Sequence, residues 1–346
     1  MIKLTEDSLA FSFSRVHRSA TVTIQFQRTL RIPDDDQDYP LPPGLGAFPL
    51  RHVDDFAARL PAAWVERGGV MLPMYQSEAM WLNFSAGYDE QRRVSYPFAV
   101  KIATGKINAV SGGTWTKGLH RRPRQDYVVV PEQPWLDGYC VAKGIIRQFV
   151  AMPLGAGYTA EEQVTGKAEH GGLQIMVYPM KREAFEKRFP KRPRRPRFDL
   201  FDRADAVYCL SCPAPEEMGL APGGRMKQEI YQDTYKLSEW DLEHGSCCYV
   251  HIANSMVWRQ ITGVNPPTTP PTAEEYTRAG LPWFLWYDDQ NAALEGSETL
   301  AAMNSVATLG KEKKDVPLPE NQPVSPEHVI KLPRRRVANQ VREFAS

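Results

Sequence analysis

The 29 prolines of this 346-residue chain set the first limit on its architecture. A proline ring fixes φ and removes a backbone donor, so it ends or kinks a helix that runs into it. Average proline usage is only about 5%. The sequence therefore excludes an architecture of long helices and predicts many short elements joined by stiff loops.

Apolar and polar residues alternate near the N-terminus, which is the pattern of a strand with one buried face. The clearest run places Val22 and Phe26 on the same face. Residues 9–13 alternate in the same way, and a turn at Arg18-Ser19 would join the two runs in a hairpin. Further strand-like runs are predicted at residues 70–84, 96–102, 127–130, 145–152 and 173–178.

These signals predict a mainly β protein. Residues 1–180 are expected to form a β-sandwich or jelly-roll-like domain. A basic, proline-broken strap over residues 181–204 would lead to a smaller α+β domain at 205–310 and an extended C-terminal tail at 311–346. Within these parts the sequence also predicts helices at 53–67 and 292–307 and strands at 206–210 and 247–259.

The strap has the sharpest change in composition. Residues 181–197 hold nine Lys or Arg and two Glu, a local charge of +7 (nine minus two). Pro190, Pro193 and Pro196 interrupt the run, so we expect it to be extended. It could hold phosphate groups, or it could be a solvated linker that pairs with an acidic surface. The candidate binding residues of the strap are Arg188, Lys191, Arg192, Arg194, Arg195 and Arg197.

Charge and cysteine usage bear on the compartment. The net charge of +1 provides no overall field to attract nucleic acid or a membrane. Charged residues stand near the N-terminus where a secretory signal needs an apolar core. Five cysteines are an odd number in a large chain, which argues against a disulfide framework. We therefore expect a cytoplasmic protein, with no bound cofactor.

Two motifs suggest ligand or metal chemistry. Residues 155–160 match the G-x-G-x-x-G/A fingerprint of dinucleotide sites, but Thr159 and Glu162 predict a short capped helix that Gly166 ends. An ordered loop is the simpler interpretation. The other motif consists of four cysteines. Two of them are adjacent, whereas the second ligand pair of a structural zinc site is normally spaced, so no metal is expected. These candidate metal ligands are Cys209, Cys212, Cys247 and Cys248.

Carboxylates near aromatic rings leave an enzyme open, because such pairs can form glycosidase-like sites when their separation suits a sugar. A core anchor, a turn and a helix cap explain the same residues more simply. Trp283 and Trp286 could also stack on a ligand, although rings on alternate sides of a strand commonly divide between core and interface. The candidate catalytic residues are Glu132, Asp137, Glu161 and Glu162, and the aromatic residues beside them are Trp135 and Tyr158.

A serine hydrolase would need a nucleophile on a sharp turn and a nearby base. Ser111 and His170 each precede two glycines, but neither lies in a G-x-S-x-G elbow. Hairpin turns are the simpler interpretation of both segments.

Several phrases together carry a resemblance, and they are residues 39–46 (YPLPPGLG), 133–138 (QPWLDG), 147–155 (RQFVAMPLG), 157–159 (GYT) and 162–163 (EQ). They resemble a family of uncharacterised microbial proteins, some of which are labelled "integral membrane protein". The resemblance covers most of residues 20–180 and, weakly, residues 280–284. It implies no activity, cofactor or catalytic residue. Its label would imply a membrane location, whereas no stretch approaches about 18 uninterrupted apolar residues, so we expect no membrane span.

These observations favour a non-enzymatic binding or self-assembly protein that uses the basic strap and the C-terminal tail, as a homo-oligomer or with a protein partner. The alternative is an enzyme that acts on a sugar or another polar small molecule through carboxylates near Trp135 and Tyr158. Nucleic-acid binding through the strap is the third choice, because no broader basic face is evident.

Overall fold

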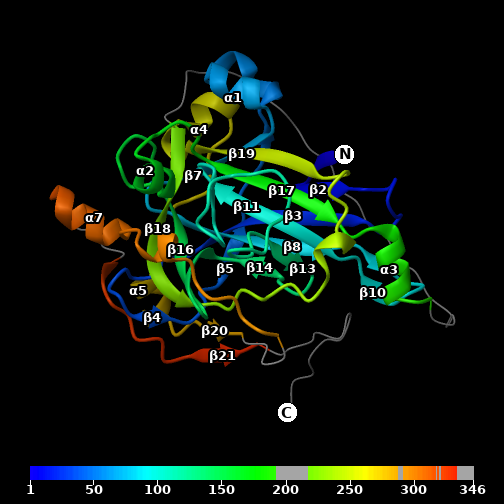
Figure 1. Cartoon of the computed structure of the whole chain (residues 1–346). Coiled ribbons are helices and arrows are strands. Elements are labelled where there is room, and N and C mark those ends of the chain that lie inside the picture. The colour runs from blue at the N-terminus through cyan, green and yellow to red at the C-terminus, as the bar shows by residue number, and fades with distance from the viewer. Residues whose placement is uncertain (192–216, 287–290, 317, 319–320, 333–346) are drawn as a thin grey trace, which may run out of the picture.

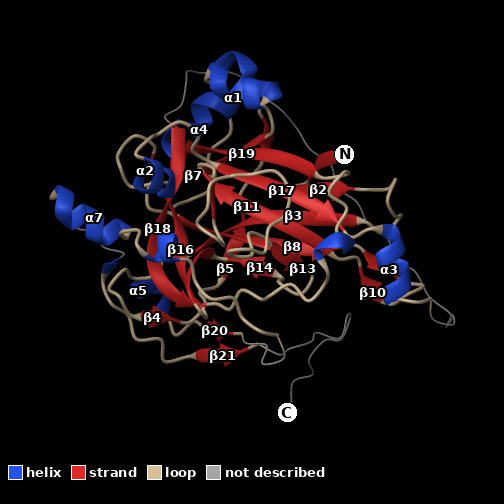
Figure 2. Cartoon of the chain, viewed as in Figure 1, coloured by secondary structure: helices blue, strands red, loops and turns tan. Residues whose placement is uncertain are grey.

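The structure is a computed structural model that describes residues 1–191, 217–286, 291–316, 318 and 321–332 (Figure 1). Strands make up 37% of the described residues and helices 18%, which confirms a mainly β fold. Strands run through the middle of the molecule and helices lie at its periphery (Figure 2). The described helices have at most eight residues, as the proline content predicts.

The strands from the N-terminal part are β1 (Ile2–Thr5), β2 (Ser8–Ser12), β3 (Thr21–Thr29), β4 (Asp38–Tyr39), β5 (Gly44–Ala47), β6 (Arg51–His52), β7 (Val70–Met74), β8 (Ala79–Ala86), β9 (Tyr88–Asp89), β10 (Val94–Ser95), β11 (Phe98–Thr104) and β12 (Ile107–Asn108). Those that follow are β13 (Val128–Val130), β14 (Trp135–Leu136), β15 (Gly138–Ala142), β16 (Ile145–Pro153), β17 (Leu173–Pro179), β18 (Glu217–Lys227), β19 (Ser246–Asn254), β20 (Trp283–Leu285) and β21 (Val329–Lys331).

Most of these strands belong to one continuous hydrogen-bonded sheet. From β8 the pairing runs through β16, β18, β19, β17 and β11 to β13. After β13 the chain forms β14. This strand pairs with β8 on the edge that β16 also uses, at the part of that edge which β16 leaves unpaired. The sheet therefore curls until its pairing returns to β8, and β3, β2 and β1 extend it from the other edge of β8.

The predicted N-terminal hairpin is present. β2 and β3 pair in antiparallel register, with Phe11 opposite Val22 and Ser12 opposite Thr21. Val22, Ile24 and Phe26 are completely buried, whereas Thr23 and Gln25 between them are half-buried. The period-two pattern in the sequence therefore gave the correct buried face, since successive strand residues point to opposite sides.

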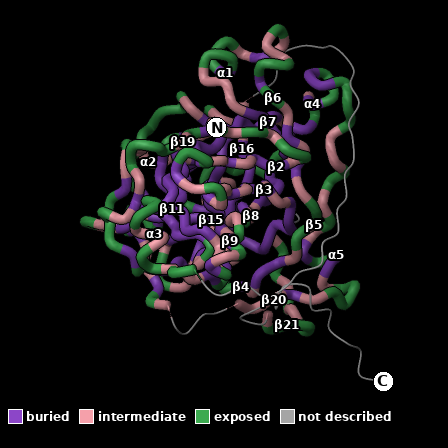
Figure 3. The backbone as a smooth tube through the Cα atoms, turned by 90° about the vertical axis from the view of Figure 1, so that its right-hand side faces the viewer, coloured by how far each residue is buried: buried purple, intermediate pink, exposed green. Residues whose placement is uncertain are grey.

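Large side chains fill the space that the curled sheet encloses, and the buried residues in Figure 3 gather in the centre of the molecule. β11 is buried at every position, so it has neighbours on both faces. Full burial of one large apolar side chain contributes about 1.5–3 kcal/mol. Among the largest buried rings are those of Phe11, Phe98, Tyr96, Tyr127, Tyr139 and Tyr178.

Short helices surround the sheet. In Figure 1, α1 and α4 lie together at one end, α2 and α7 flank β18, and α3 lies at the opposite side near β10. The helices are η1 (Asp54–Arg59), α1 (Ala62–Arg67), α2 (Ala160–Thr165), α3 (Arg182–Arg188), η2 (Leu237–Glu239), α4 (Ser255–Thr262), α5 (Ala273–Arg278), α6 (Glu298–Ala301) and α7 (Val306–Lys313).

The capped helix after the glycine motif is confirmed. Thr159 and Glu162 form the reciprocal hydrogen bonds of a capping box at the start of α2, and Gly166 ends the helix in a left-handed conformation. The prediction that the strap is extended from Lys181 onward is wrong for its described part. Helix α3 ends before Pro190, the first proline of the strap, so no ring interrupts it.

Three further expectations need correction. Pro61 divides the helix predicted at 53–67 into η1 and α1. The strand predicted at 247–259 stops early, because Asn254 caps α4 with its side chain. Two short helices replace the one predicted at 292–307, and Ser297 and Ser305 cap them.

The strands that follow the strap join the same sheet as those that precede it. β18 pairs with β16, and β19 pairs with β17 and with β7. The division of the chain into two domains at residues 181–204 stays a prediction. The strand predicted at 206–210 lies outside the described residues.

The described part of the C-terminal tail lies against its own chain. β21 pairs in parallel with β20, and β20 contacts Leu41 through a bridge at Phe284. Arg31 donates a hydrogen bond of 2.9 Å to Asn321. Across the described ranges of the chain, we find no helix that is long and apolar enough to cross a membrane.

Candidate functional site

A cavity of about 340 Å³ lies where three distant segments meet, and we call it the basic cleft. Its walls come from the turn after β2 (residues 14–18), the β9–β10 hairpin (residues 89–92) and the segment that includes α3 (residues 182–191). Figure 1 shows α3 and β10 next to each other at this side of the molecule. The charged residues of the basic cleft are Arg15, Arg18, Asp89, Arg92, Arg182, Glu186 and Lys191.

The turn after β2 presents two arginines to the cleft. The backbone amide of Phe13 donates to the carbonyl of Ala20 (2.8 Å) and closes the turn. Val16 is buried beneath it, whereas Arg15 and Arg18 are exposed. Apolar anchoring of the turn therefore fixes the backbone from which both guanidinium groups extend.

Asp89 ties the hairpin wall to this turn. Its carboxylate accepts from the backbone amide of Arg92 (2.9 Å) and from the hydroxyl of Ser19 (3.4 Å), and it lies 3.7 Å from Nε2 of His17. The side chain is 2% exposed. Because its oxygens are occupied within the protein, Asp89 serves mainly to hold the two walls together.

His17 forms an uncharged part of the cleft. Its ring stacks on Tyr96 and meets the edge of Phe185, with centroid distances of 5.3 Å and 5.1 Å. Burial lowers the pKa of His17; the charge of Asp89 opposes this effect, and the charge of Arg92 adds to it. Nδ1 accepts from the backbone amide of Ser19 (3.2 Å), so the proton of the neutral ring is on Nε2.

Two of the cleft's cations are already paired. Arg92 lies 3.5 Å from Glu186, donates to the carbonyl of Phe189 (2.7 Å) and covers the ring of Phe185. Arg182 lies 3.2 Å from the same carboxylate of Glu186. The contacts of Arg92 hold α3 against the hairpin, and the pair of Arg182 with Glu186 lies within α3.

The other cations are available to a ligand. Arg15, Arg18 and Lys191 are exposed, and they have no ion-pair partner among the described residues. Five cationic and two acidic side chains line the cleft, which gives a net charge of +3 (five minus two) with His17 neutral. The basic cleft is therefore a concave, positively charged site.

The structure divides the predicted strap residues. Lys191 lines the basic cleft, but Arg188 forms two hydrogen bonds of 2.7 Å to Glu239 and covers the ring of Tyr235. This contact lowers the pKa of Glu239 to about 2. Arg188 is thus occupied by its own protein. Arg192, Arg194, Arg195 and Arg197 lie outside the described residues.

The predicted aromatic residues lie in two groups away from the cleft. Trp135 and Trp286 meet edge to face at 5.4 Å, so these two are brought together. Trp283 is fully buried between neighbouring rings, which makes it a core residue. Tyr158 donates to Asp315, and the ammonium of Lys313 covers its ring.

The four candidate carboxylates occupy separate local networks. Glu132 accepts from the hydroxyl of Tyr235 (2.7 Å), and burial raises its pKa. Glu161 accepts from the backbone amide of Gly171 and from the ring of His170, which holds the loop that follows α2. Glu162 caps α2. Each carboxylate therefore has a partner in its own chain, and an active site built from them stays a prediction.

Asp137 is buried beside Gln228, whose side chain donates to the carboxyl group and accepts from the backbone amide of Asp137. Burial raises the pKa of Asp137 to about 7, against an ordinary value of 3.8. The folded protein therefore keeps a proton that the unfolded chain has lost. Its stabilising effect is complete below about pH 4 and is lost as the pH rises through about 7.

This predicts a pH-dependent effect of Asp137→Asn. Relative to the variant, the wild type should lose about 2 kcal/mol of unfolding free energy between about pH 5 and pH 6.5, at about 1.4 kcal/mol per pH unit. Urea unfolding of both proteins across this range measures the difference. A constant difference between the two proteins would mean that the carboxyl group is already ionised at about pH 5.

The cysteines that the structure describes do not belong to a group of metal ligands. Cys247 and Cys248 are adjacent in β19, where one is exposed and the other buried, and both are free thiols. His251 lies between the rings of Trp64 and Tyr249, and burial lowers its pKa to about 3. No group of metal ligands is found among the described residues. Cys209 and Cys212 lie outside them.

Sequence reasoning missed most of the basic cleft. Arg18 stands in the predicted turn with Arg15 shortly before it, and Arg92 lies in the turn of a hairpin that was not predicted. The available signal was an exposed arginine pair in a turn next to an apolar anchor, which is too common to identify a site. Convergence of these segments on α3 depends on the tertiary fold.

No protein-family model matches the chain, and no curated protein or solved structure matches it significantly.

Proposed function

We propose that this protein is a binding protein that recognises a small phosphorylated ligand through the basic cleft. The observation that carries the proposal is the group of three exposed cations, Arg15, Arg18 and Lys191, around a cavity of about 340 Å³ with a net charge of +3. This keeps the basic strap as a binding element, but assigns its contact to Lys191, the last strap residue that the structure describes, and the other contacts to the turn after β2.

The chemistry of the cleft suits phosphate. Guanidinium groups bind phosphate oxygens through paired, charge-assisted hydrogen bonds, and a lysine adds a point charge. The ion pairs of Arg92 and Arg182 with Glu186 fix the cleft wall before a ligand arrives, which lowers the entropic cost of binding. The same pairs leave Arg15, Arg18 and Lys191 as the cations that a ligand would neutralise.

A small ligand is favoured over a nucleic acid. Proteins that bind single strands combine a basic groove with aromatic rings on which bases stack. The rings next to the cleft belong to Tyr96 and Phe185, and both are completely buried. They pack on His17 and offer no face to a base.

The other proposals have less support. Self-assembly through the C-terminal tail remains a proposal, but the described tail residues lie against their own chain. An enzyme built on the candidate carboxylates also remains a proposal, although each of these groups has its own partner.

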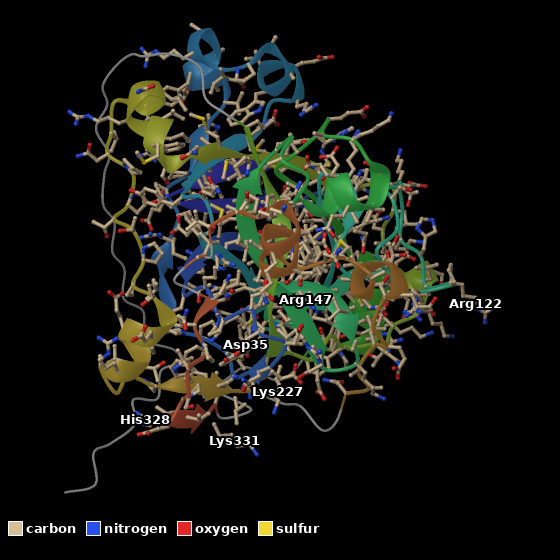
Figure 4. All side chains as sticks on the ribbon, turned by 90° about the vertical axis from the view of Figure 1, so that its left-hand side faces the viewer. Asp35, Arg122, Arg147, Lys227, His328 and Lys331 are labelled. Carbon is tan, nitrogen blue, oxygen red and sulfur yellow. The ribbon has the colours of Figure 1, made fainter. Side chains whose placement is uncertain are left out.

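Isothermal titration with sodium tripolyphosphate tests the proposed function. Charge-assisted hydrogen bonds are worth about 1.5–3 kcal/mol each, so Arg15→Glu with Arg18→Glu should weaken binding by more than about 100-fold. A matched control reverses Lys227 and Lys331, two exposed lysines on the face shown in Figure 4. The control should bind within about threefold of the wild type, because only long-range, salt-screened charge is lost.

Two results would contradict the proposal. Equal loss of affinity in the control would show that tripolyphosphate responds only to overall charge. Tighter binding of a short oligonucleotide than of tripolyphosphate, with the same dependence on Arg15 and Arg18, would establish nucleic-acid binding instead.

A further inference from the structure

A second cavity, of about 490 Å³, lies beside the loop that joins β12 to β13 and shares no lining residue with the basic cleft. Side chains and backbone from residues 111–126 form one wall, and residues 297–299 form the other. The lining residues that matter here are Ser111, Thr116, His120, Arg122, Arg124 and Asp126.

A histidine and an aspartate are aligned in this cavity. Nδ1 of His120 lies 2.9 Å from Oδ2 of Asp126, and the backbone amide of His120 donates to Oδ1 (2.9 Å). An ionised carboxylate can only accept, so Nδ1 carries the ring proton. Nε2 then keeps its lone pair, and it has no hydrogen-bond partner among the described residues. The imidazole side chain is 49% exposed.

A buried lysine holds the aspartate in place. Nζ of Lys101 lies 2.7 Å from Oδ2 of Asp126, and it also donates to the carbonyls of Thr116 (2.8 Å) and Gly118 (3.1 Å). The lysine side chain is 1% exposed, and it extends from the fully buried strand β11. Lys101 thus pairs with the carboxylate of Asp126 and fixes the loop that carries His120.

The rim of the cavity is cationic and the walls are linked. Arg122 is exposed and points away from the molecule at its edge, as Figure 4 shows. Arg124 is held by the carbonyl of Gly296 and by Glu298. The hydroxyl of Ser297 donates to the carbonyl of Ser111 (2.7 Å), which joins the two walls.

We propose that this cavity is a hydrolytic site in which His120 acts as a general base on a carboxylic ester that carries a negative charge. The His120–Asp126 pair supplies an oriented proton acceptor, and Arg122 supplies the attraction for the anionic end of the substrate. Positioned acid–base groups of this kind contribute about 10²–10⁴-fold to a rate.

The reaction consumes one water molecule. Nε2 of His120 removes a proton from water while the water oxygen bonds to the ester carbonyl carbon. The resulting adduct collapses, and the carbon–oxygen bond to the alcohol breaks. The imidazolium returns its proton to the leaving alkoxide, so the products are a carboxylic acid and an alcohol and His120 is neutral again. Asp126 keeps its charge throughout and stabilises the imidazolium.

Two synthetic esters of equal chain length test the proposal in the full-length protein. The mono-4-nitrophenyl ester of adipic acid carries a carboxylate, and 4-nitrophenyl hexanoate is its neutral analogue. We expect the wild type to favour the charged ester. His120→Ala should lower kcat/KM for both esters by about 100-fold. Arg122→Ala should lower it by about tenfold for the charged ester alone.

His244 provides the matched control. Its Nδ1 also contacts an aspartate, Asp241, at 2.8 Å, and its side chain is 52% exposed, but Asp241 has no lysine as an ion-pair partner in the described part of the chain. His244→Ala should keep the wild-type rates. His120→Gln serves as a second variant in case the alanine variant is poorly folded. Wild-type rates in a folded His120 variant, equal losses in the His244 variant, or no hydrolysis by the wild type above buffer would each overturn the proposal.

Discussion

Replacing Asp233 by alanine is expected to lower the free energy of unfolding by about 3–5 kcal/mol. The carboxylate is completely buried and accepts from the hydroxyl of Tyr127 (2.6 Å), the indole of Trp240 (2.9 Å) and the backbone amide of Tyr235 (2.7 Å). Arg121 is its ion-pair partner. The alanine variant leaves these donors unpaired, and each buried unpaired donor costs about 1–3 kcal/mol.

Urea unfolding of the variant and of two controls measures this effect. Asp233→Asn keeps the shape and one acceptor oxygen, so it should lose less than the alanine variant. Asp241→Ala removes a carboxylate that is 13% exposed and pairs with an exposed histidine, and it should cost less than about 1 kcal/mol. A loss below about 1 kcal/mol for Asp233→Ala would contradict a structural role for this network.

Replacing Lys101 by methionine should also cost about 3–5 kcal/mol, because it leaves the carboxylate of Asp126 buried without its cation. The methionine side chain preserves most of the apolar stem, although it removes the ammonium that lies over the ring of Trp115. The double variant Lys101→Met with Asp126→Asn should recover part of this loss, since no unpaired charge remains. Thermal and urea unfolding of the single and double variants measure the coupling.

Lys106 is the control for this pair. It lies beyond the end of β11 and is exposed, so Lys106→Met should change the unfolding free energy by less than about 0.5 kcal/mol. Equal effects of the two lysine substitutions would show that the ion pair with Asp126 contributes nothing specific. If the double variant recovers no stability, the loss of unfolding free energy in Lys101→Met would come from altered packing and not from an unpaired charge.

The mainly β fold could be predicted because its signal is local. Alternation at Val22 and Phe26 identifies a strand and its buried face, and Thr159 with Glu162 identifies a helix start. Strand pairing could not be predicted in the same way. β8 takes partners from three distant segments, and that choice depends on which surfaces fit together after the chain has collapsed.

The strap shows how composition can mislead. Its prolines begin at residue 190, so the preceding segment is free to form α3. Phe185 anchors that helix in the core, and Arg188 turns back to Glu239. A count of charge over residues 181–197 treats paired and unpaired arginines alike, whereas the structure separates Arg188 from Lys191.

The basic cleft and the second cavity differ in how far the sequence could reveal them. His120 and Asp126 are close in sequence, so their pairing could have been proposed from a short loop. Lys101, which fixes Asp126, comes from a strand whose other residues are apolar or small, and no local pattern marks it. The basic cleft needs contacts between residues that are 70 or more positions apart, such as Ser19 with Asp89 at a separation of 70 and Arg92 with Phe189 at 97.

A crystal structure of the protein with tripolyphosphate bound is the most direct test of ligand recognition by the basic cleft. We predict phosphate oxygens within hydrogen-bond distance of the guanidinium groups of Arg15 and Arg18 and of Nζ of Lys191, with Arg92 and Arg182 still paired to Glu186. Tripolyphosphate bound elsewhere, with the basic cleft empty, would contradict the proposed function.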